Sequence, residues 1–463
     1  MDALLPPDLL ERVLAEALSR GGDFADVFVE DRISTGLSLD DRKVERASAG
    51  RDRGVGVRVV QGGQTFFGHV DSYAEDALLA VARDVAAGVR RGDARTVSLS
   101  WSAPQRRAEV LADPAGVPAA EKAALLRQAD EAARTGRAEV VQVSAGYAEG
   151  RQRVQIATSD GVHTGDDRTR TRLGVSVVAR RGDLIQTGRR SVGRPAGYEV
   201  VADGAAARIA AEAADVAVTM LESAPCPSGP MTVVLNHGFG GVLFHEACGH
   251  GLEADAIQKR ASIYSGRIGE RVAADVVSAH DDGRLPGGWG TNACDDEGTP
   301  TQDTQVIADG VLGSYLYDGT RARRDGVAST GNGRRQSFRH LPIPRMTTTF
   351  IAPGTASRDE VIGSVARGFF AASFAGGQVE PAKGDFVFGV NEGYLIEDGR
   401  LTRPLRGATL IGNGIDILRQ VELVGSDFQT DVGFCGKDGQ TVPAGVAQAT
   451  LRIRQMTVGG TEV

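Results

Sequence analysis

The stretches "GVGVRVVQGGQTFFGH" (54–69) and "GVSVVARRGDLIQTGRR" (174–190) share one layout. Each begins with valines at alternate positions, passes through a glycine-containing turn and continues as a second strand-like run. Alternation with a period of two, followed by a short glycine turn, is typical of a β-hairpin. The sequence therefore predicts that one antiparallel hairpin is used twice in the N-terminal half.

The elements around these hairpins also repeat. Apolar residues at helical spacing predict flanking helices at 7–20, 74–89, 119–136 and 203–222. Short strand-like runs precede each hairpin, for example "ADVFVED" (25–31) and "TGLSLDD" (35–41) before the first one. We interpret the repeat as an internal duplication of a helix/antiparallel-strand unit. The alternative is a chance likeness between short elements.

The order of these elements predicts an α+β fold in three parts. Residues 1–110 form an N-terminal α+β unit, and residues 111–226 form a second unit, the candidate repeat of the first. The proline-rich segment "SAPCPSGP" (223–230) marks the next boundary. Residues 227–463 are rich in glycine and in strand-like runs, interrupted by a helix that contains "HEACGH" (245–250).

Composition argues against several classes of protein. The 463 residues include 52 Lys and Arg against 60 Asp and Glu, and no basic tract is interleaved with aromatic residues, which argues against nucleic-acid binding. The N-terminus lacks the basic start of a signal peptide, and no run of about 18 apolar residues is present. The four cysteines are widely spaced, as is usual in a reducing compartment. We therefore expect a cytoplasmic protein without a membrane segment.

The motif "HEACGH" separates His245 and His250 by five positions, one more than in the H-E-x-x-H helix of zinc hydrolases. An α-helix turns about 100° per residue, so side chains five apart lie about 140° apart and cannot share an ion. A π-bulge would absorb the extra residue, and Gly249 would lower the cost of that distortion. If both histidines bind one metal ion, the spacing predicts a bulged helix.

Glu246 occupies the position of the general base in H-E-x-x-H enzymes. Catalytic zinc usually has three protein ligands, so His245 and His250 need a third. Cys435, in the glycine-flanked "GFCGKDGQ", could present its thiolate to a cleft. The other candidates are carboxylates and histidines, namely Glu253, Asp255, Asp295, Asp296, Glu297, His237, His280 and His340. The residues alone leave this choice open.

Five segments follow one another in order, namely "HEACGHGLEAD" (245–255), "DDEGTP" (295–300), "STGNGRRQSFRHLPIPRMTTTFIAPG" (329–354), "ATLIGNG" (408–414) and "CGKDGQTVPAGVAQATLRIRQMTVGG" (435–460). Together they resemble the TldD branch of the TldD/PmbA family of metallopeptidases. The resemblance covers essentially all of 228–463 and is looser over 1–226.

This resemblance implies a zinc-dependent peptidase that acts on unfolded or flexible peptides and small labile proteins. It implies that Zn²⁺ is held by His245, His250 and Cys435, with Glu246 as the catalytic base. It also implies a closed inner cavity and an extended peptide substrate bound by strand addition. The expected partner is a PmbA (TldE) subunit that has lost the motif, with a homodimer as the alternative.

Other polar residues are weaker candidates. In "TGNGRR", Asn332, Arg334 and Arg335 could line the substrate channel and meet a carboxylate or carbonyl group. A structural turn is the alternative interpretation of this segment. Asp255 or Asp296 could orient a ligand histidine through a hydrogen bond, although loop acids are commonly just exposed.

Two other functions are compatible with parts of the sequence. A dipeptidyl-peptidase of the H-E-x-x-G-H kind would use a carboxylate as the third metal ligand. A non-catalytic binding or regulatory subunit of a heterodimeric protease is the second alternative. The intact His245, Glu246 and His250 argue against that subunit role.

Overall fold

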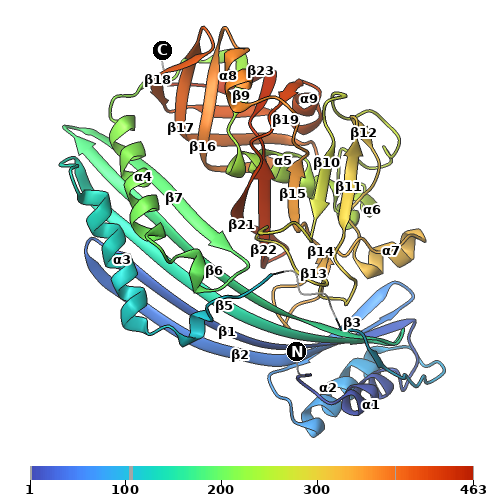
Figure 1. Ribbon diagram of the computed structural model, residues 1–463. Coiled ribbons are helices and arrows are strands. Elements are labelled where there is room, and N and C mark those ends of the chain that lie inside the picture. Colours follow the sequence, from blue (N-terminus) through green and yellow to red (C-terminus); the bar gives the residue numbers. More distant parts are fainter. Residues whose placement is uncertain (1–2, 104–107, 381, 462–463) are drawn as a thin grey trace.

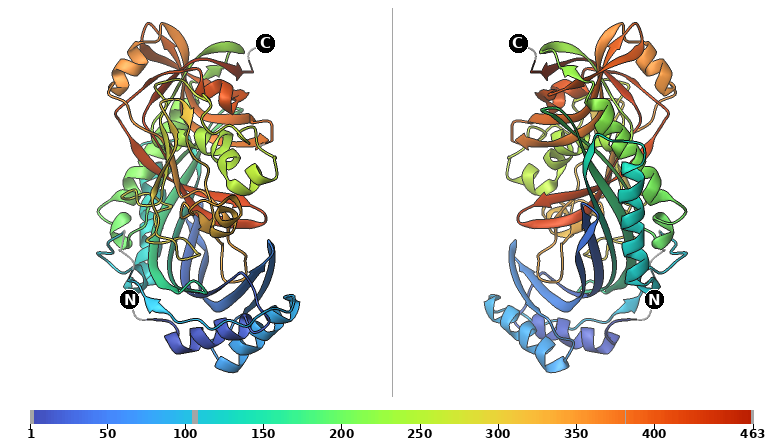
Figure 2. Two further views of the ribbon diagram at one scale, coloured as in Figure 1. Left: turned by 90° about the vertical axis from the view of Figure 1, so that its right-hand side faces the viewer. Right: turned by 90° about the vertical axis from the view of Figure 1, so that its left-hand side faces the viewer.

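The computed structural model describes residues 3–103, 108–380 and 382–461 (Figure 1). The N-terminal half forms a long curved sheet, and the C-terminal half lies on the inner side of its curve (Figures 1 and 2). The predicted α+β fold class is confirmed by this mixture of helices and strands.

Amphipathic stripes account for the helices of the N-terminal half. In the first helix Leu10, Val13 and Leu14 are buried on one face. All the predicted N-terminal helices are present within a few residues of their predicted bounds. They are α1 (Pro7–Ala17), α2 (Glu75–Gly88), α3 (Ala119–Arg134) and α4 (Ala205–Met220).

The N-terminal sheet has the strand order β3-β2-β1-β5-β6, and both β7 and β4 pair with β6. Its strands are β1 (Phe24–Asp40), β2 (Lys43–Gln61), β3 (Gln64–Val70), β4 (Ser100–Trp101), β5 (Val140–Thr158), β6 (Val162–Arg181) and β7 (Leu184–Arg194). The series α1-β1-β2-β3-α2 is followed, after the short β4, by α3-β5-β6-β7-α4. This repeated order agrees with the predicted duplication, and β1 and β5 join the two series as an antiparallel pair.

The strands are longer than the predicted short runs. The prediction of separate strands at 25–31 and 35–41 is wrong, because β1 covers both without a break. Residues 32–34 are exposed and interrupt the apolar alternation, while the backbone stays paired with β2 and β5. The predicted strands stop at the exposed residues because the prediction followed hydropathy. The backbone of these residues nevertheless continues to pair with both neighbouring strands.

The two predicted hairpins are present as β2-β3 and β6-β7. Their turns use glycines in the left-handed region, with φ of 56° at Gly62, 77° at Gly63 and 61° at Gly182. Residues with a Cβ adopt this conformation at a cost, which explains the glycines in both turns.

The C-terminal half contains two larger sheets. One has the order β12-β11-β10-β15-β22-β21, and the other has the order β16-β9-β23-β19-β17-β18-β8, with β20 paired to β23. Because β16 also pairs with β17, the strands β16, β9, β23, β19 and β17 close into a barrel. A hydrophobic core that includes Phe244, Phe369 and Phe388 fills this half.

The bounds of the C-terminal elements are as follows. The strands are β8 (Ala224–Pro225), β9 (Gly229–Leu235), β10 (Ala279–Asp282), β11 (Asp303–Ala308), β12 (Val311–Leu312), β13 (Gly333–Arg334), β14 (Ile343–Pro344), β15 (Thr348–Ile351), β16 (Arg367–Glu380), β17 (Asp385–Glu397), β18 (Arg400–Arg406), β19 (Thr409–Asn413), β20 (Val421–Val424), β21 (Gln429–Lys437), β22 (Gln440–Gln448) and β23 (Leu451–Gly459). The helices are α5 (Val242–Ala247), α6 (Ala254–Gln258), α7 (Gly319–Asp325), α8 (Arg358–Gly363) and α9 (Gly414–Leu418).

The short helix α5 carries the first half of the "HEACGH" motif and contacts β15, β16, β17 and β22. Within the described residues, no helix is both long and apolar enough to cross a membrane. One sheet runs through both predicted N-terminal units. The division of the chain into 1–110, 111–226 and 227–463 stays a prediction.

Candidate metal centre

The backbone of the "HEACGH" motif breaks between the two histidines. Helix α5 ends at Ala247, Cys248 has φ −126° and ψ −50°, and a 3₁₀ helix begins at Gly249. The predicted π-bulge is therefore wrong, because the helix ends and restarts with a tighter pitch. A Cβ on Gly249 would lie 2.1 Å from Sδ of Met346, so this glycine permits close packing of the restarted turn.

The break brings the imidazole rings of the two histidines close together. The ring centroids of His245 and His250 lie 5.2 Å apart, with an interplanar angle of 87°. Cys435, on β21, places Sγ 3.4 Å from Nε2 of His250. The candidate ligand atoms of these three residues all lie within 4.8 Å of one another. They belong to two segments that are far apart in the sequence.

The chemistry of this cluster fits a zinc-like cation. Burial alone would raise the pKa of the Cys435 thiol, but His245 and His250 outweigh it and lower the pKa to about 4. A thiolate and two imidazoles are ligands that zinc favours. His245, His250 and Cys435 would therefore hold such an ion together.

Each histidine is oriented by a hydrogen bond on Nδ1. Nδ1 of His245 lies 3.2 Å from Oγ1 of Thr349, and Nδ1 of His250 lies 3.0 Å from Oε2 of Glu253. Burial would raise the pKa of Glu253, but His250 and Lys437 lower it to about 2. A charged acceptor on Nδ1 directs Nε2 of His250 toward the cluster, which is the usual support of a metal-binding histidine.

Glu246 lies at the edge of the cluster. Its side chain is 29% exposed, and a carboxylate oxygen lies 3.8 Å from Nε2 of His250. Glu246, His250 and Glu253 line a cavity of 460 Å³, which is also lined by Val379 of β16. A carboxylate that is partly open to a cavity beside a metal-binding cluster can exchange protons with a bound water or substrate.

Asp255 and Asp296 are each paired with a basic side chain. Asp255 accepts a hydrogen bond of 2.6 Å from Nζ of Lys437, and Asp296 accepts one of 2.7 Å from Arg168. The carboxylate that contacts the candidate ligand His250 is that of Glu253, which the sequence offered only as a third metal ligand. The available sequence signal for the role of Glu253 was the C-G-K segment, which places Lys437, the cationic partner of Glu253, close to Cys435.

The three candidate residues of the segment "TGNGRR", Asn332, Arg334 and Arg335, are buried. Asn332 donates to Oδ2 of Asp281 at 2.6 Å, and Arg334 donates to the carbonyl of Pro443 at 2.6 Å. Arg334 and Arg335 line a second cavity, described below, and neither lines the cavity beside Glu246.

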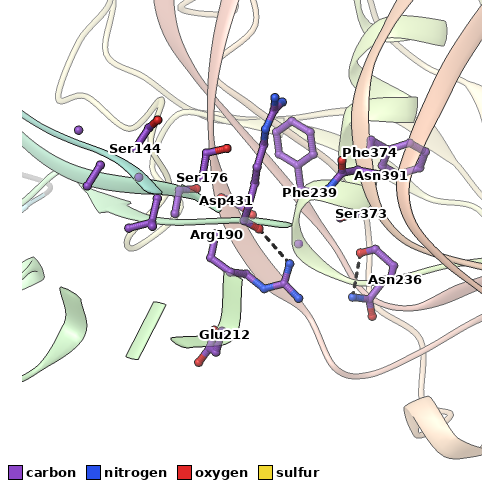
Figure 3. A pocket seen from close by; sticks show the side chains of 18 of the residues that line it. Ser144, Ser176, Arg190, Glu212, Asn236, Phe239, Ser373, Phe374, Asn391 and Asp431 are labelled. Carbon is purple, nitrogen blue, oxygen red and sulfur yellow. Dashed lines mark hydrogen bonds between the residues drawn. The ribbon is translucent and has the colours of Figure 1, made fainter. Parts of the chain in front are cut away.

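Another cavity, of 1030 Å³, is lined by residues of both halves of the chain (Figure 3). Arg190 from the N-terminal sheet and Asp431 from β21 both line it, together with Asn236 and Phe239, which precede α5. Burial raises the pKa of Asp431 to about 6. None of the three candidate metal ligands lines this cavity, so its size does not make it the reaction site.

Comparisons with known families cover most of the chain. The description "PmbA/TldA metallopeptidase C-terminal domain" matches residues 228–460. The central domain of the same family matches residues 112–221, and its domain 1 matches residues 25–89.

Curated relatives extend over nearly the full length. A "Metalloprotease TldD homolog" from Haemophilus influenzae is 38% identical, covering 96% of this chain and 94% of that protein. A metalloprotease from Methanothermobacter thermautotrophicus is 33% identical, covering 95% of this chain and 96% of that protein.

Solved structures share the fold. A Thermotoga maritima protein described as a modulator of a DNA gyrase superposes with a TM-score of 0.82 at 21% identity, covering 98% of this chain and 99% of that one. TldE from Thermococcus kodakarensis superposes with a TM-score of 0.77 at 18% identity, covering 98% and 100% respectively.

Proposed function

Since the chain belongs to the PmbA/TldD family of metallopeptidases, we propose that it is a zinc-dependent peptidase acting on unfolded or flexible peptides and small labile proteins. The buried cluster of His245, His250 and Cys435 supports this proposal most directly. When bound, zinc supplies Lewis-acid chemistry, which polarises a carbonyl and lowers the pKa of water.

Proton transfer and the orientation of the cluster depend on the side chains around it. Glu246 accepts a proton from the attacking water on its carboxylate and returns it to the leaving amine. Glu253 keeps the proton of His250 on Nδ1, so that Nε2 faces the cluster. Lys437, 2.9 Å from Glu253, balances the charge of that buried carboxylate.

Replacement of Glu246 by Gln tests the catalytic role. Because the amide cannot accept the proton, we expect cleavage of an unstructured fluorogenic peptide to fall by a factor of about 10² to 10⁴. Zinc content, measured by elemental analysis, should stay unchanged. Glu131→Gln, an exposed change of the same charge on α3, is the control. Retained turnover with full zinc occupancy would remove Glu246 from this role.

We further propose that the peptide binds in extended form and that a PmbA/TldE-type subunit completes the assembly. The fold shared with TldE supports a partner of this kind, and a homodimer is the alternative. Co-expression with a TldE-type subunit, followed by mass spectrometry of the subunits in the purified complex, would distinguish a heterodimer from a homodimer.

A cytoplasmic location accords with four free, buried cysteines. Free thiols persist in a reducing compartment. Fractionation of cells that express the tagged chain would test this location.

A further inference from the structure

A second cavity, of 440 Å³, lies between the N-terminal sheet and the C-terminal half. Its wall on the sheet includes Arg168, Arg170 and Arg172 of β6, which face the same side because they occupy alternate positions of one strand. The arginines that line the cavity are Arg32, Arg168, Arg170, Arg172, Arg334 and Arg335. Its acidic lining residues are Glu149 and Asp296.

Both acids already have cationic partners. Glu149 pairs with Lys122 at 2.7 Å, and Asp296 pairs with Arg168 at 2.7 Å. Of the remaining arginines, Arg335 pairs with Asp26, which does not line the cavity. Within the described residues, no ion pair is formed by Arg32, Arg170, Arg172 or Arg334.

Arg170 and Arg334 are both buried and have no carboxylate partner among the described residues. Arg170 donates through Nε and Nη2 to the carbonyls of Trp289 and Thr291 and to Oδ1 of Asn292, which leaves Nη1 uncommitted. Arg334 donates to the carbonyls of Met346 and Pro443. All these acceptors are neutral, and in the described ranges neither guanidinium forms an ion pair. Burial, and then the neighbouring Arg168 and Arg334, lower the pKa of Arg170 to about 9.

Further donors at the cavity have no acceptor. The buried indole N–H of Trp289 and the Nε and Nη1 atoms of Arg335 make no hydrogen bond within the described part of the chain. Arg335 forms a buried ion pair of 3.2 Å with Asp26, and it lies over the ring of Phe28 at 4.5 Å. Arg172, at the exposed rim, lies over the ring of Phe434 at 4.8 Å.

Buried cations without carboxylate partners cost free energy, and a bound anion offsets that cost. Guanidinium groups match the oxygens of phosphates and carboxylates in a two-pronged geometry. We propose that this cavity binds a small oxyanion, carried by phosphate or by a small-molecule carboxylate. Its volume is in the range of small-ligand sites.

The anion site is distinct from the metal centre, yet both use the hairpin β21-β22. In this hairpin Phe434 pairs with Pro443, and Cys435 pairs with Val442. Phe434 and Pro443 line the anion cavity, whereas Sγ of Cys435 lies beside His250. Anion binding therefore does not require metal, and the proposal stands whether or not the peptidase mechanism is correct.

Calorimetric titration of the full chain, with metal removed by a chelator, tests the proposal. Inorganic phosphate and citrate are titrated separately, with ionic strength held constant by chloride. We expect saturable binding of at least one probe. The tighter probe assigns the oxyanion to a phosphate or to a carboxylate.

Variants at the rim make the test specific. Arg172→Gln removes an exposed charge at the cavity and should weaken binding by a factor of about ten, because a charge-assisted hydrogen bond is lost. Arg46→Gln, an exposed change of the same charge on β2 outside the cavity, should leave binding unchanged. Circular dichroism checks that both variants fold. Absence of binding for both probes up to about 10 mM, or equal weakening by both variants, would overturn the proposal.

Discussion

Oε2 of Glu253 lies 3.0 Å from Nδ1 of His250 and 2.9 Å from Nζ of Lys437. One buried carboxylate thus connects a strand lysine to a histidine of the candidate metal centre. Because the contact selects which imidazole nitrogen carries the proton, it should control the affinity of the cluster for metal.

Replacement of Glu253 by Gln tests this contact. We expect the affinity for zinc to fall by a factor of about 10 to 100, since a neutral amide holds the imidazole less firmly. Competition with a chromophoric chelator measures the affinity. Asp255→Asn, which alters only the other acid on Lys437, is the matched control and should have a smaller effect. Equal effects of the two variants would mean that Glu253 acts only through Lys437.

Replacement of Cys435 by Ser distinguishes a thiolate site from a carboxylate site. We expect loss of most bound zinc and of peptide cleavage, because a serine hydroxyl is a poor zinc ligand. Cys294→Ser, at a buried cysteine outside the cluster, should retain zinc. Unchanged metal content in the Cys435 variant would favour the dipeptidyl-peptidase alternative.

The raised pKa of Asp431 predicts a dependence of stability on pH. Its pKa rises from 3.8 to about 6 because burial disfavours the charged form. Between these values the folded state holds a proton that the unfolded state releases, so the free energy of unfolding falls as pH rises. Asp431→Asn should therefore stabilise the protein by about 1 to 2 kcal/mol at pH 8, allowing for partial solvent exposure, and by nothing below about pH 4. Thermal melts of the variant and of the unchanged protein at both pH values would check this prediction. A difference in stability that is the same at both pH values would contradict it.

The buried pair of Arg168 and Asp296 connects β6 to the "DDEGTP" segment at 2.7 Å. Asp296→Asn leaves Arg168 partly unpaired in the interior, so we expect a loss of about 3 to 5 kcal/mol in the free energy of unfolding. Arg151→Gln, which breaks a pair whose arginine is 45% exposed, should cost less than about 1 kcal/mol. Urea denaturation of both variants measures the difference. Comparable losses would show that burial does not strengthen the first pair.

The sequence predicted the repeated helices and hairpins because their patterns are local. Each amphipathic stripe and each glycine turn lies within a short window. It did not predict the continuity of β1, because residues 32–34 are exposed while their backbone pairs with two neighbours. Pairing between strands that are distant in sequence leaves no local trace in hydropathy.

Local sequence patterns predicted only part of the candidate metal centre. The motif identified His245 and His250, but not the break in the backbone between them, where Gly249 packs closely against Met346 from a distant segment. Cys435 was one of several candidates for the third ligand, and only family resemblance singled it out, because nothing near it distinguishes a ligand thiol from a core cysteine. Glu253 was weighed only as a direct ligand, since its contact with Nδ1 of His250 depends on the 3₁₀ turn.

The separation of 185 positions between His250 and Cys435 also has a consequence during translation. A nascent chain emerging from the ribosome carries both imidazoles long before the thiol exists. With the ligand set proposed above, the metal centre is complete only after β21 has been synthesised.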